Sequence, residues 1–285
     1  MRFHGSVLKK LKSALVGGLP AVELQAEVQP YLRHLTGLVL NAGAGHRPVN
    51  TGLPTLTMDF DETAPVDFLA DMHFIPLRNQ CVDSVLSVAV LEHTRIPWEC
   101  ARELWRVLKP GGTAVICVPF LQPEHAVPHD FFRYTVYGLQ SMLEWAGFKV
   151  HSVERLGRQH RALAWVILEM NRASPWLKRW VIAMLATFIA RRAKTGNIPP
   201  SSVYTGSYAV ARKPGSLERP QEIDASKEGW FLPLLVDPVT KTPLEPGNRQ
   251  MHNSEGDIYE FTSGTLDLRP KHGLSQDGGR PWAKR

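Results

Sequence analysis

Cysteine is scarce in this chain, and apolar runs long enough to cross a membrane are missing. The 285 residues contain three cysteines, Cys81, Cys100 and Cys117, which fall in helix-like or strand-like sequence. This odd number argues against a disulfide or zinc framework and predicts buried thiols in a reducing compartment. No apolar run reaches the roughly 20 residues of a membrane-spanning helix, and glycines interrupt the basic N-terminal stretch, so no signal peptide is expected. We therefore expect a cytoplasmic protein.

A strong excess of one charge is also missing. The formal net charge of +6 is compatible with an anionic partner but too small to require one. Basic residues concentrate near Lys9–Lys12 and between Lys178 and Lys194. The length allows one large domain with a smaller module beside it.

The stretch Gly37 to Gly45, GLVLNAGAG, is the most informative part of the sequence. Its apolar run from Leu38 to Leu40 predicts a strand buried on both faces. The Gly-Ala-Gly that follows allows a sharp turn and a close approach to a ligand. A second strand, Pro54 to Phe60, carries Asp59 near its end, where an acidic residue can accept hydrogen bonds from ribose hydroxyls.

Strands and helices then alternate along the chain, which predicts a parallel sheet with helices on both faces. The helix after Pro97 ends at the turn Lys109-Pro110-Gly111-Gly112, and a second helix covers Tyr137–Ala146. We predict a doubly wound, Rossmann-like α/β fold with a seven-stranded, mostly parallel sheet whose last strand is antiparallel. The further strands are expected at Val66–Leu69, Ser84–Ala89, Thr113–Pro119, Phe148–Leu156 and Gly206–Lys213.

Residues 37–157 resemble class I S-adenosylmethionine-dependent methyltransferases. The motifs that carry this resemblance are LNAGAG (40–45), Asp59, LADMHFIPL (69–77), VDSVLSVAVLEH (82–93), ELWRVLKPGG (103–112) and AVICVPF (114–120). A dehydrogenase would share only the glycine turn and Asp59. The resemblance implies S-adenosyl-L-methionine as cofactor. The cofactor-binding residues that it implies are Asn41, Gly43, Gly45, Asp59, Asp71, Met72 and Glu92.

These residues have different implied roles. Asp59 would hold the ribose, Asp71 and Met72 the adenine, and the segment Leu91-Glu92-His93 would lie beside the methyl group. Asn41 stands where the family usually has an acidic residue, and Arg47 where it often has a third glycine. These two departures leave a non-catalytic role open.

The segment FLQPEHAVPHDFFRYT (120–135) follows the fifth predicted strand, at the edge of the sheet where ligands bind. Its pattern H-x-x-P-x-D-F-F-R-x-T resembles methyltransferases of bacterial glycan and cell-envelope synthesis, which implies a small-molecule or lipid-linked sugar acceptor. Histidine can deprotonate a hydroxyl. The candidate catalytic bases, unranked, are His93, His125 and His129, and the candidate acceptor-binding residues are Asp130, Arg133 and Tyr134.

The domain boundaries follow from these assignments. We expect a helical segment at 1–36, a methyltransferase domain at 37–213 with a helical insertion at 160–200, and a linker at 214–228. The insertion contains the apolar, basic-flanked segment 175–194. Its open interpretations are an acceptor lid, a helix buried in the domain or in a homodimer, and a helix at an anionic membrane surface.

The tail at 229–270 resembles a small zinc-ribbon-like module that is also found in activator partners of tRNA methyltransferases. Asp237-Pro238-Val239-Thr240 replaces the usual Cys-Pro-x-Cys turn, so we expect a β-rich module without a metal site. Residues 271–285 are expected to be disordered.

The leading hypothesis is O-methylation of a glycan or lipid-linked sugar. Two alternatives remain open, an RNA or protein methyltransferase and a non-catalytic binding module. The sequence has LEH in place of the Asn/Asp-Pro-Pro-Tyr motif of many amine methylators, and we do not expect a nucleic-acid partner.

Overall fold

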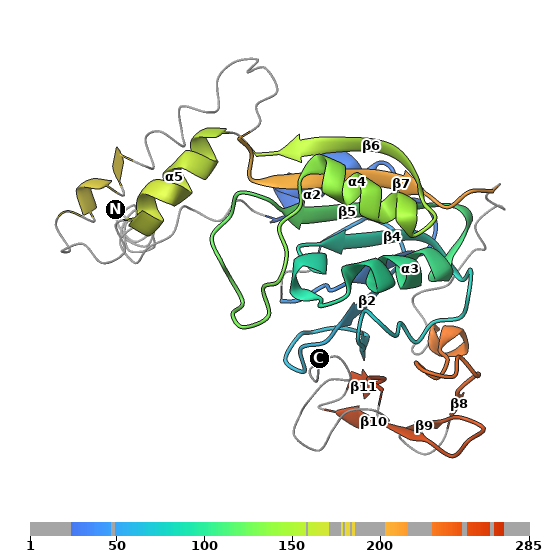
Figure 1. Ribbon diagram of the computed structural model, residues 1–285. Helices are drawn as coiled ribbons and strands as arrows, with labels where there is room; N and C mark the ends of the chain where they lie inside the picture. Colours follow the sequence, from blue (N-terminus) through green and yellow to red (C-terminus); the bar gives the residue numbers. More distant parts are fainter. Residues whose placement is uncertain are drawn as a thin grey trace, which may run out of the picture.

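The computed structural model describes residues 24–46, 49–157, 159–170, 203–215, 230–246, 250–262 and 265–270, with a few positions between 178 and 185. One sheet crosses the molecule (Figure 1). Helices α3 (Pro97–Val107) and α4 (Val136–Trp145) cover one face of it, and α2 (Leu24–Leu32) covers the other. Pro30 lies inside α2.

Seven strands form the predicted α/β sheet in the order β6-β7-β5-β4-β1-β2-β3. β1 pairs in parallel with β2 and β4, and β4 pairs in parallel with β5, whereas β7 runs antiparallel between β5 and β6. The prediction of a mostly parallel sheet with an antiparallel last strand is confirmed. The strands are β1 (Val39–Ala42), β2 (Thr55–Asp59), β3 (Phe68–Leu69), β4 (Val82–Val88), β5 (Leu108–Pro119), β6 (Lys149–Leu156) and β7 (Gly206–Arg212).

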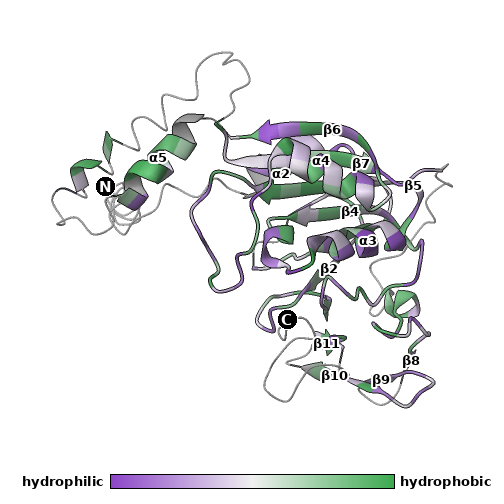
Figure 2. Cartoon of the chain, in the orientation of Figure 1, coloured by the Kyte–Doolittle hydropathy of each residue, from purple (hydrophilic) through white to green (hydrophobic). Residues whose placement is uncertain are grey.

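Successive residues of the central strands pack into two separate cores, one on each face. In β1, Leu40 belongs to the cluster that contains Leu104 of α3, whereas Val39 packs in the cluster that contains Val28 of α2. Because side chains alternate along a strand, a strand covered on both faces must be apolar at successive positions. Figure 2 shows this hydrophobic character in β4 and β5, and the more hydrophilic β6 at the edge.

The sheet does not end at β3, which corrects the expected number of seven strands. β11 (Thr265–Asp267) pairs in parallel with β3, and the tail continues the sheet through β10 (Ile258–Thr262), β9 (Gln250–His252) and β8 (Glu245–Pro246), giving eleven strands. An uncovered edge strand leaves a row of unpaired backbone groups. The tail satisfies those of β3, and it lies directly against the α/β sheet (Figure 1).

A buried carboxylate, Asp237, organises the first turn of the tail. Asp237 is 1% exposed, and its Oδ1 accepts the backbone amides of Val239 and Thr240 at 2.8 and 2.7 Å. Its Oδ2 accepts Asn253 Nδ2 at 2.7 Å and the Tyr259 hydroxyl at 2.6 Å. These four hydrogen bonds join the turn to the hairpin that follows it.

The expectations for residues 1–23, 216–229 and 271–285, and for most of 171–202, lie outside the described residues, as does Arg47. The described start of the insertion is α5 (Gln159–Met170), which extends away from the sheet (Figure 1). Among the described residues, no helix is both long enough and apolar enough to cross a bilayer.

Candidate functional site

A cavity of about 840 Å³ opens at the carboxyl ends of β1, β2 and β4. Loops after these strands form its walls, as expected for a ligand site in a doubly wound sheet. The predicted site residues that line it are Asn41, Gly43, Gly45, Asp59, Asp71, Met72, His93 and His129. The other predicted site residues, all within the described part of the chain, do not line it: Glu92, His125, Asp130, Arg133 and Tyr134.

Hydrogen bonds hold the glycine turn after β1 against the end of β2. The Gly43 amide donates to the Met58 carbonyl at 2.9 Å, and the Gly45 amide donates to Asp59 Oδ2 at 2.8 Å. Gly43 has a φ of +80°, and a Cβ there would collide with the side chain of Val90. The turn therefore requires glycine at position 43. The carboxylate of Asp59 positions the turn, and its remaining lone pairs can accept hydrogen bonds from a ligand in the cavity.

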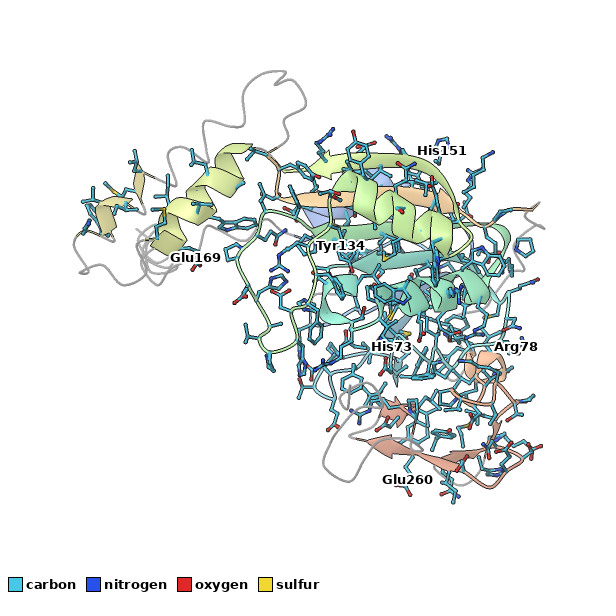
Figure 3. The ribbon with its side chains drawn as sticks, in the orientation of Figure 1. His73, Arg78, Tyr134, His151, Glu169 and Glu260 are labelled. Carbon is cyan, nitrogen blue, oxygen red and sulfur yellow. The ribbon has the colours of Figure 1, made fainter. Side chains whose placement is uncertain are left out.

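Asp71 lies in the segment that follows β3 and lines the cavity. The amide of His73 donates to Asp71 Oδ1 at 2.9 Å, and His73 Nδ1 lies 2.6 Å from the same oxygen. Since His73 is buried (Figure 3), it orients Asp71. The sequence analysis missed this role, although an aspartate that accepts the amide two residues later is a common turn pattern.

The tail supplies a cavity residue that the sequence analysis also missed. Arg269 follows β11 and lines the cavity, with its guanidinium 5.2 Å from the centre of the Phe60 ring. It donates to Glu62 Oε1 at 2.7 Å and to Asp267 Oδ2 at 2.6 Å. Arg269 and Glu62 are 207 positions apart, so no local pattern could have predicted their contact.

Glu92 and two histidines form a cluster beside the cavity. Glu92 lies in the 3-10 helix η1 (Leu91–His93), and its side chain is fully buried. Its Oε1 is 3.7 Å from His93 Nε2 and 3.6 Å from His125 Nε2. The Glu92 carboxylate raises the pKa of His125 above its ordinary value, against the effect of burial. The expected cofactor contact of Glu92 stays a prediction; in the structure Glu92 does not line the cavity, and its carboxylate faces two imidazoles.

Asp130 and Arg133 brace the 120–135 loop itself, and their expected role in binding an acceptor stays a prediction. Arg133 Nη1 and Nη2 donate to Asp130 Oδ1 and Oδ2, both at 2.6 Å. Arg133 also donates to the carbonyls of Pro123 and Gln122, at 3.0 and 3.3 Å. The hydrogen bonds from Arg133 hold the pKa of Asp130 at about 2. The donors of Arg133 are directed into the loop.

Tyr134 is largely buried, and its expected role in binding an acceptor also stays a prediction. It is 7% exposed and belongs to the main core, where its hydroxyl donates to the Leu91 carbonyl at 3.2 Å. This contact supports η1 from the core side. Tyr134 therefore positions the segment that carries Glu92 and His93 (Figure 3).

Replacing Arg133 with alanine is expected to destabilise the protein by about 2 kcal/mol, because the nearly buried Asp130 carboxylate loses its partner. The Arg133→Lys variant should recover less than half of this, since an ammonium cannot make the bidentate contact. Urea denaturation measures both. Glu124→Gln, on the exposed side of the same loop, is the matched control. A loss below about 0.5 kcal/mol for Arg133→Ala, the range of an ordinary surface substitution, would contradict the bracing role.

Comparison with known proteins gives a partial match. Residues 53–116 match the family model described as a methyltransferase domain. Over 128 residues the chain is 27% identical to tRNA U34 carboxymethyltransferase of Syntrophotalea carbinolica, covering 38% of this chain and 37% of that relative. The chain thus matches little more than a third of the relative's length.

Two solved structures are similar at low identity. A SAM-dependent methyltransferase from Archaeoglobus fulgidus is 16% identical with a TM-score of 0.45, covering 73% of this chain and 100% of that one. A methyltransferase solved with the Trm112 activator of Haloferax volcanii is 14% identical with a TM-score of 0.46, covering 75% of this chain and 97% of that one.

The matched family model describes a methyltransferase domain, and S-adenosylmethionine is the cofactor of that family. The residues present fit it. The cavity volume of about 840 Å³ is in the range of cofactor pockets. A Cβ at Gly45 would meet no atom within 4 Å, so a ligand can approach this backbone closely. The carboxylates of Asp59 and Asp71 in the walls suit a cofactor with a positive sulfonium.

Proposed function

We propose that this chain is an S-adenosylmethionine-dependent methyltransferase that methylates a hydroxyl of a glycan or lipid-linked sugar. One observation carries the proposal: a single cavity collects the glycine turn, Asp59 and Asp71 together with His93 and His129. The first three are the groups expected to hold the cofactor, and the two histidines are candidate bases. The resemblance of the 120–135 segment to glycan methyltransferases supports the choice of acceptor.

Each residue has a defined part in this proposal. Asp59 accepts hydrogen bonds from the ribose hydroxyls, Asp71 accepts one from the adenine amino group, and Met72 packs on the ring. Asn41 offers an amide oxygen to the cofactor's ammonium without the charge of a carboxylate. When bound, S-adenosylmethionine supplies the electrophilic methyl group.

The protein's own contribution to methyl transfer is positioning and exclusion of water, because in-line displacement from a sulfonium needs little other assistance. A hydroxyl acceptor must also lose its proton, which requires a base. His93 and His129 line the cavity and are the stronger candidates. His125 does not line the cavity, so in this proposal it contacts Glu92 and not the acceptor.

Calorimetric titration with S-adenosylmethionine and S-adenosylhomocysteine is the first test. We expect both to bind, and release of S-adenosylhomocysteine should then be measured with sugar and lipid-linked sugar acceptors. Cofactor binding with turnover on amines alone would reject the hydroxyl acceptor. Failure of both ligands to bind would reject the enzyme and favour a non-catalytic module.

An RNA acceptor is the second candidate, favoured by the partial match to a tRNA-modifying relative and by the net charge of +6. Methylation of unfractionated tRNA with radiolabelled cofactor distinguishes the two. The glycan proposal predicts no incorporation into tRNA under conditions in which sugar acceptors are methylated.

A further inference from the structure

Glu92 has a buried carboxyl group without the hydrogen bonds that normally accompany one. Its side chain is 0% exposed, and within the described part of the chain neither Oε1 nor Oε2 has a hydrogen-bond partner. An isolated carboxylate in such a place is costly unless a positive group compensates it. The Nε2 atoms of His93 and His125 lie 3.7 and 3.6 Å from Oε1 of Glu92, which is beyond hydrogen-bond distance.

The two imidazoles are oriented by backbone carbonyls on their other nitrogen. His93 Nδ1 lies 2.7 Å from the His129 carbonyl, and His125 Nδ1 lies 3.2 Å from the Pro123 carbonyl. A carbonyl only accepts, so Nδ1 of each ring carries the hydrogen when the ring binds a metal ion through Nε2. Both Nε2 atoms face the same carboxylate oxygen, Oε1 of Glu92. This arrangement places three electron-pair donors together.

Such a set has the features of a metal site. One ligand atom from each of Glu92, His93 and His125 lies within 4.8 Å of the others. Ligands of a zinc ion at about 2.0–2.1 Å lie roughly 3.4 Å apart, so an adjustment on the order of 1 Å would close the set. A histidine ligand that donates its second N–H to a carbonyl is the usual supporting arrangement.

The scaffold around the cluster is already rigid. The backbone amide of Phe131 donates to the Glu92 carbonyl at 2.8 Å, and Asp130 Oδ2 accepts the His125 amide at 2.8 Å. Arg133 fixes Asp130 in turn through its two 2.6 Å contacts. The loop bracing therefore holds His125 opposite Glu92.

We propose that Glu92, His93 and His125 bind one divalent transition-metal ion of the zinc class. Two imidazoles and one carboxylate form a donor set that binds such ions in preference to Mg²⁺ or Ca²⁺. Since His93 also lines the cavity, an ion here would lie next to the space proposed for the acceptor. With its Nε2 on the ion His93 could not also act as the base, which leaves His129 for that role. Use of the ion to activate an acceptor hydroxyl rests on the proposed function, whereas ion binding itself does not.

The test is titration of the untagged, metal-free protein with Zn²⁺ by calorimetry and with Co²⁺ by visible absorption. We expect one ion per chain, and an affinity about 100-fold lower in Glu92→Gln and in His125→Ala. Neither residue lines the cavity, so both variants should keep the wild-type affinity for S-adenosylmethionine. His151→Ala, which removes a histidine on β6 away from the site (Figure 3), is the matched control and should bind Zn²⁺ like wild type.

A stability measurement keeps the test valid if a variant folds poorly. The amide of Glu92→Gln can donate to imidazole nitrogens, so its Tm in metal-free buffer should equal or exceed that of wild type. Zn²⁺ should raise the Tm of wild type and of His151→Ala only. Equal Zn²⁺ binding by wild type and Glu92→Gln, or no binding of Zn²⁺ or Co²⁺ by wild type, would overturn the site. Metal binding without cofactor binding would reject the proposed function and leave the metal site standing.

Discussion

Asp59→Ala is expected to abolish measurable binding of S-adenosylmethionine. The Asp59 carboxylate accepts the amides of Gly45 and Asp61 at 2.8 and 2.9 Å, so its loss frees the glycine turn. It also removes the acceptors proposed for two ribose hydroxyls. A hydrogen bond to a charged group contributes about 1.5–3 kcal/mol, so the loss of two lowers affinity by at least about 100-fold. Calorimetric titration of the folded variant measures this.

Asp61→Ala is the matched control, because Asp61 is a second carboxylate on the same rim whose side chain is 52% exposed. Its hydrogen bonds go to Thr63 and His46, and it does not hold the glycine turn. We expect a loss of affinity of less than about tenfold from this exposed charge. Equal losses in the two variants would show that only the general negative potential matters. Unchanged binding in Asp59→Ala would remove the cofactor site from this cavity.

The elements that local patterns predicted are those whose burial follows from their own sequence. The continuous apolar run at Leu38–Leu40 predicted a strand covered on both faces, and β1 does contribute Val39 and Leu40 to opposite cores. The helical spacing of Cys100 and Leu104 after Pro97 predicted α3, which begins at Pro97 and buries both. In both cases the local pattern of apolar residues is enough to predict the element and its buried side.

The roles of polar side chains in the 120–135 loop could not be predicted in this way. The sequence shows that Asp130 and Arg133 are close to the ligand edge of the sheet, but not whether they face the cavity or each other. A spacing of three residues is compatible with both arrangements, and in the structure Asp130 and Arg133 form an ion pair with each other. Tyr134 likewise depends on the distant Leu91 carbonyl. The sequence places the loop at the edge of the sheet, but it does not reveal that Asp130 and Arg133 pair with each other.

Contacts between the tail and the sheet were equally beyond local reasoning. The two-residue strand β3 gives little sign that it has a second neighbour, yet Leu266 and Asp267 of β11 pair with Phe68 and Leu69. Arg269 reaches the cavity wall only because of this pairing. The resemblance to a zinc-ribbon-like module predicted β structure, and the missing cysteines left open what stabilises its first turn.

The structure gives a physical answer in Asp237, the residue that the resemblance places at the first cysteine of the Cys-Pro-x-Cys turn. Burial alone would raise the pKa of Asp237, but hydrogen bonds from Tyr259, the amides of Thr240 and Val239, and Asn253 outweigh it. The pKa of this carboxyl therefore lies below its usual value. One fully hydrogen-bonded carboxylate thus connects the turn to the hairpin through the side chains of Tyr259 and Asn253.

Asp237→Ala is accordingly expected to destabilise the protein by about 4 kcal/mol, because it leaves the buried Tyr259 hydroxyl without an acceptor and removes acceptors of the buried Asn253 amide and of two partly buried backbone amides. For a chain of this size the loss corresponds to a Tm about 10 °C lower. Hydrogen exchange should increase first in residues 230–270. Glu260→Ala, an exposed carboxylate on β10 (Figure 3), is the matched control and should change stability by less than about 0.5 kcal/mol.

The pH dependence of stability separates this interpretation from a simple loss of packing. A carboxyl whose pKa is lower in the folded protein stabilises it fully above the unfolded pKa of about 3.9. That stabilisation is lost as the pH falls through the lower folded pKa. The difference in unfolding free energy between wild type and Asp237→Asn, which cannot ionise, should therefore be constant above about pH 5 and shrink below about pH 4. A difference that stays constant down to pH 2.5 would mean that the charge of Asp237 does not stabilise the turn.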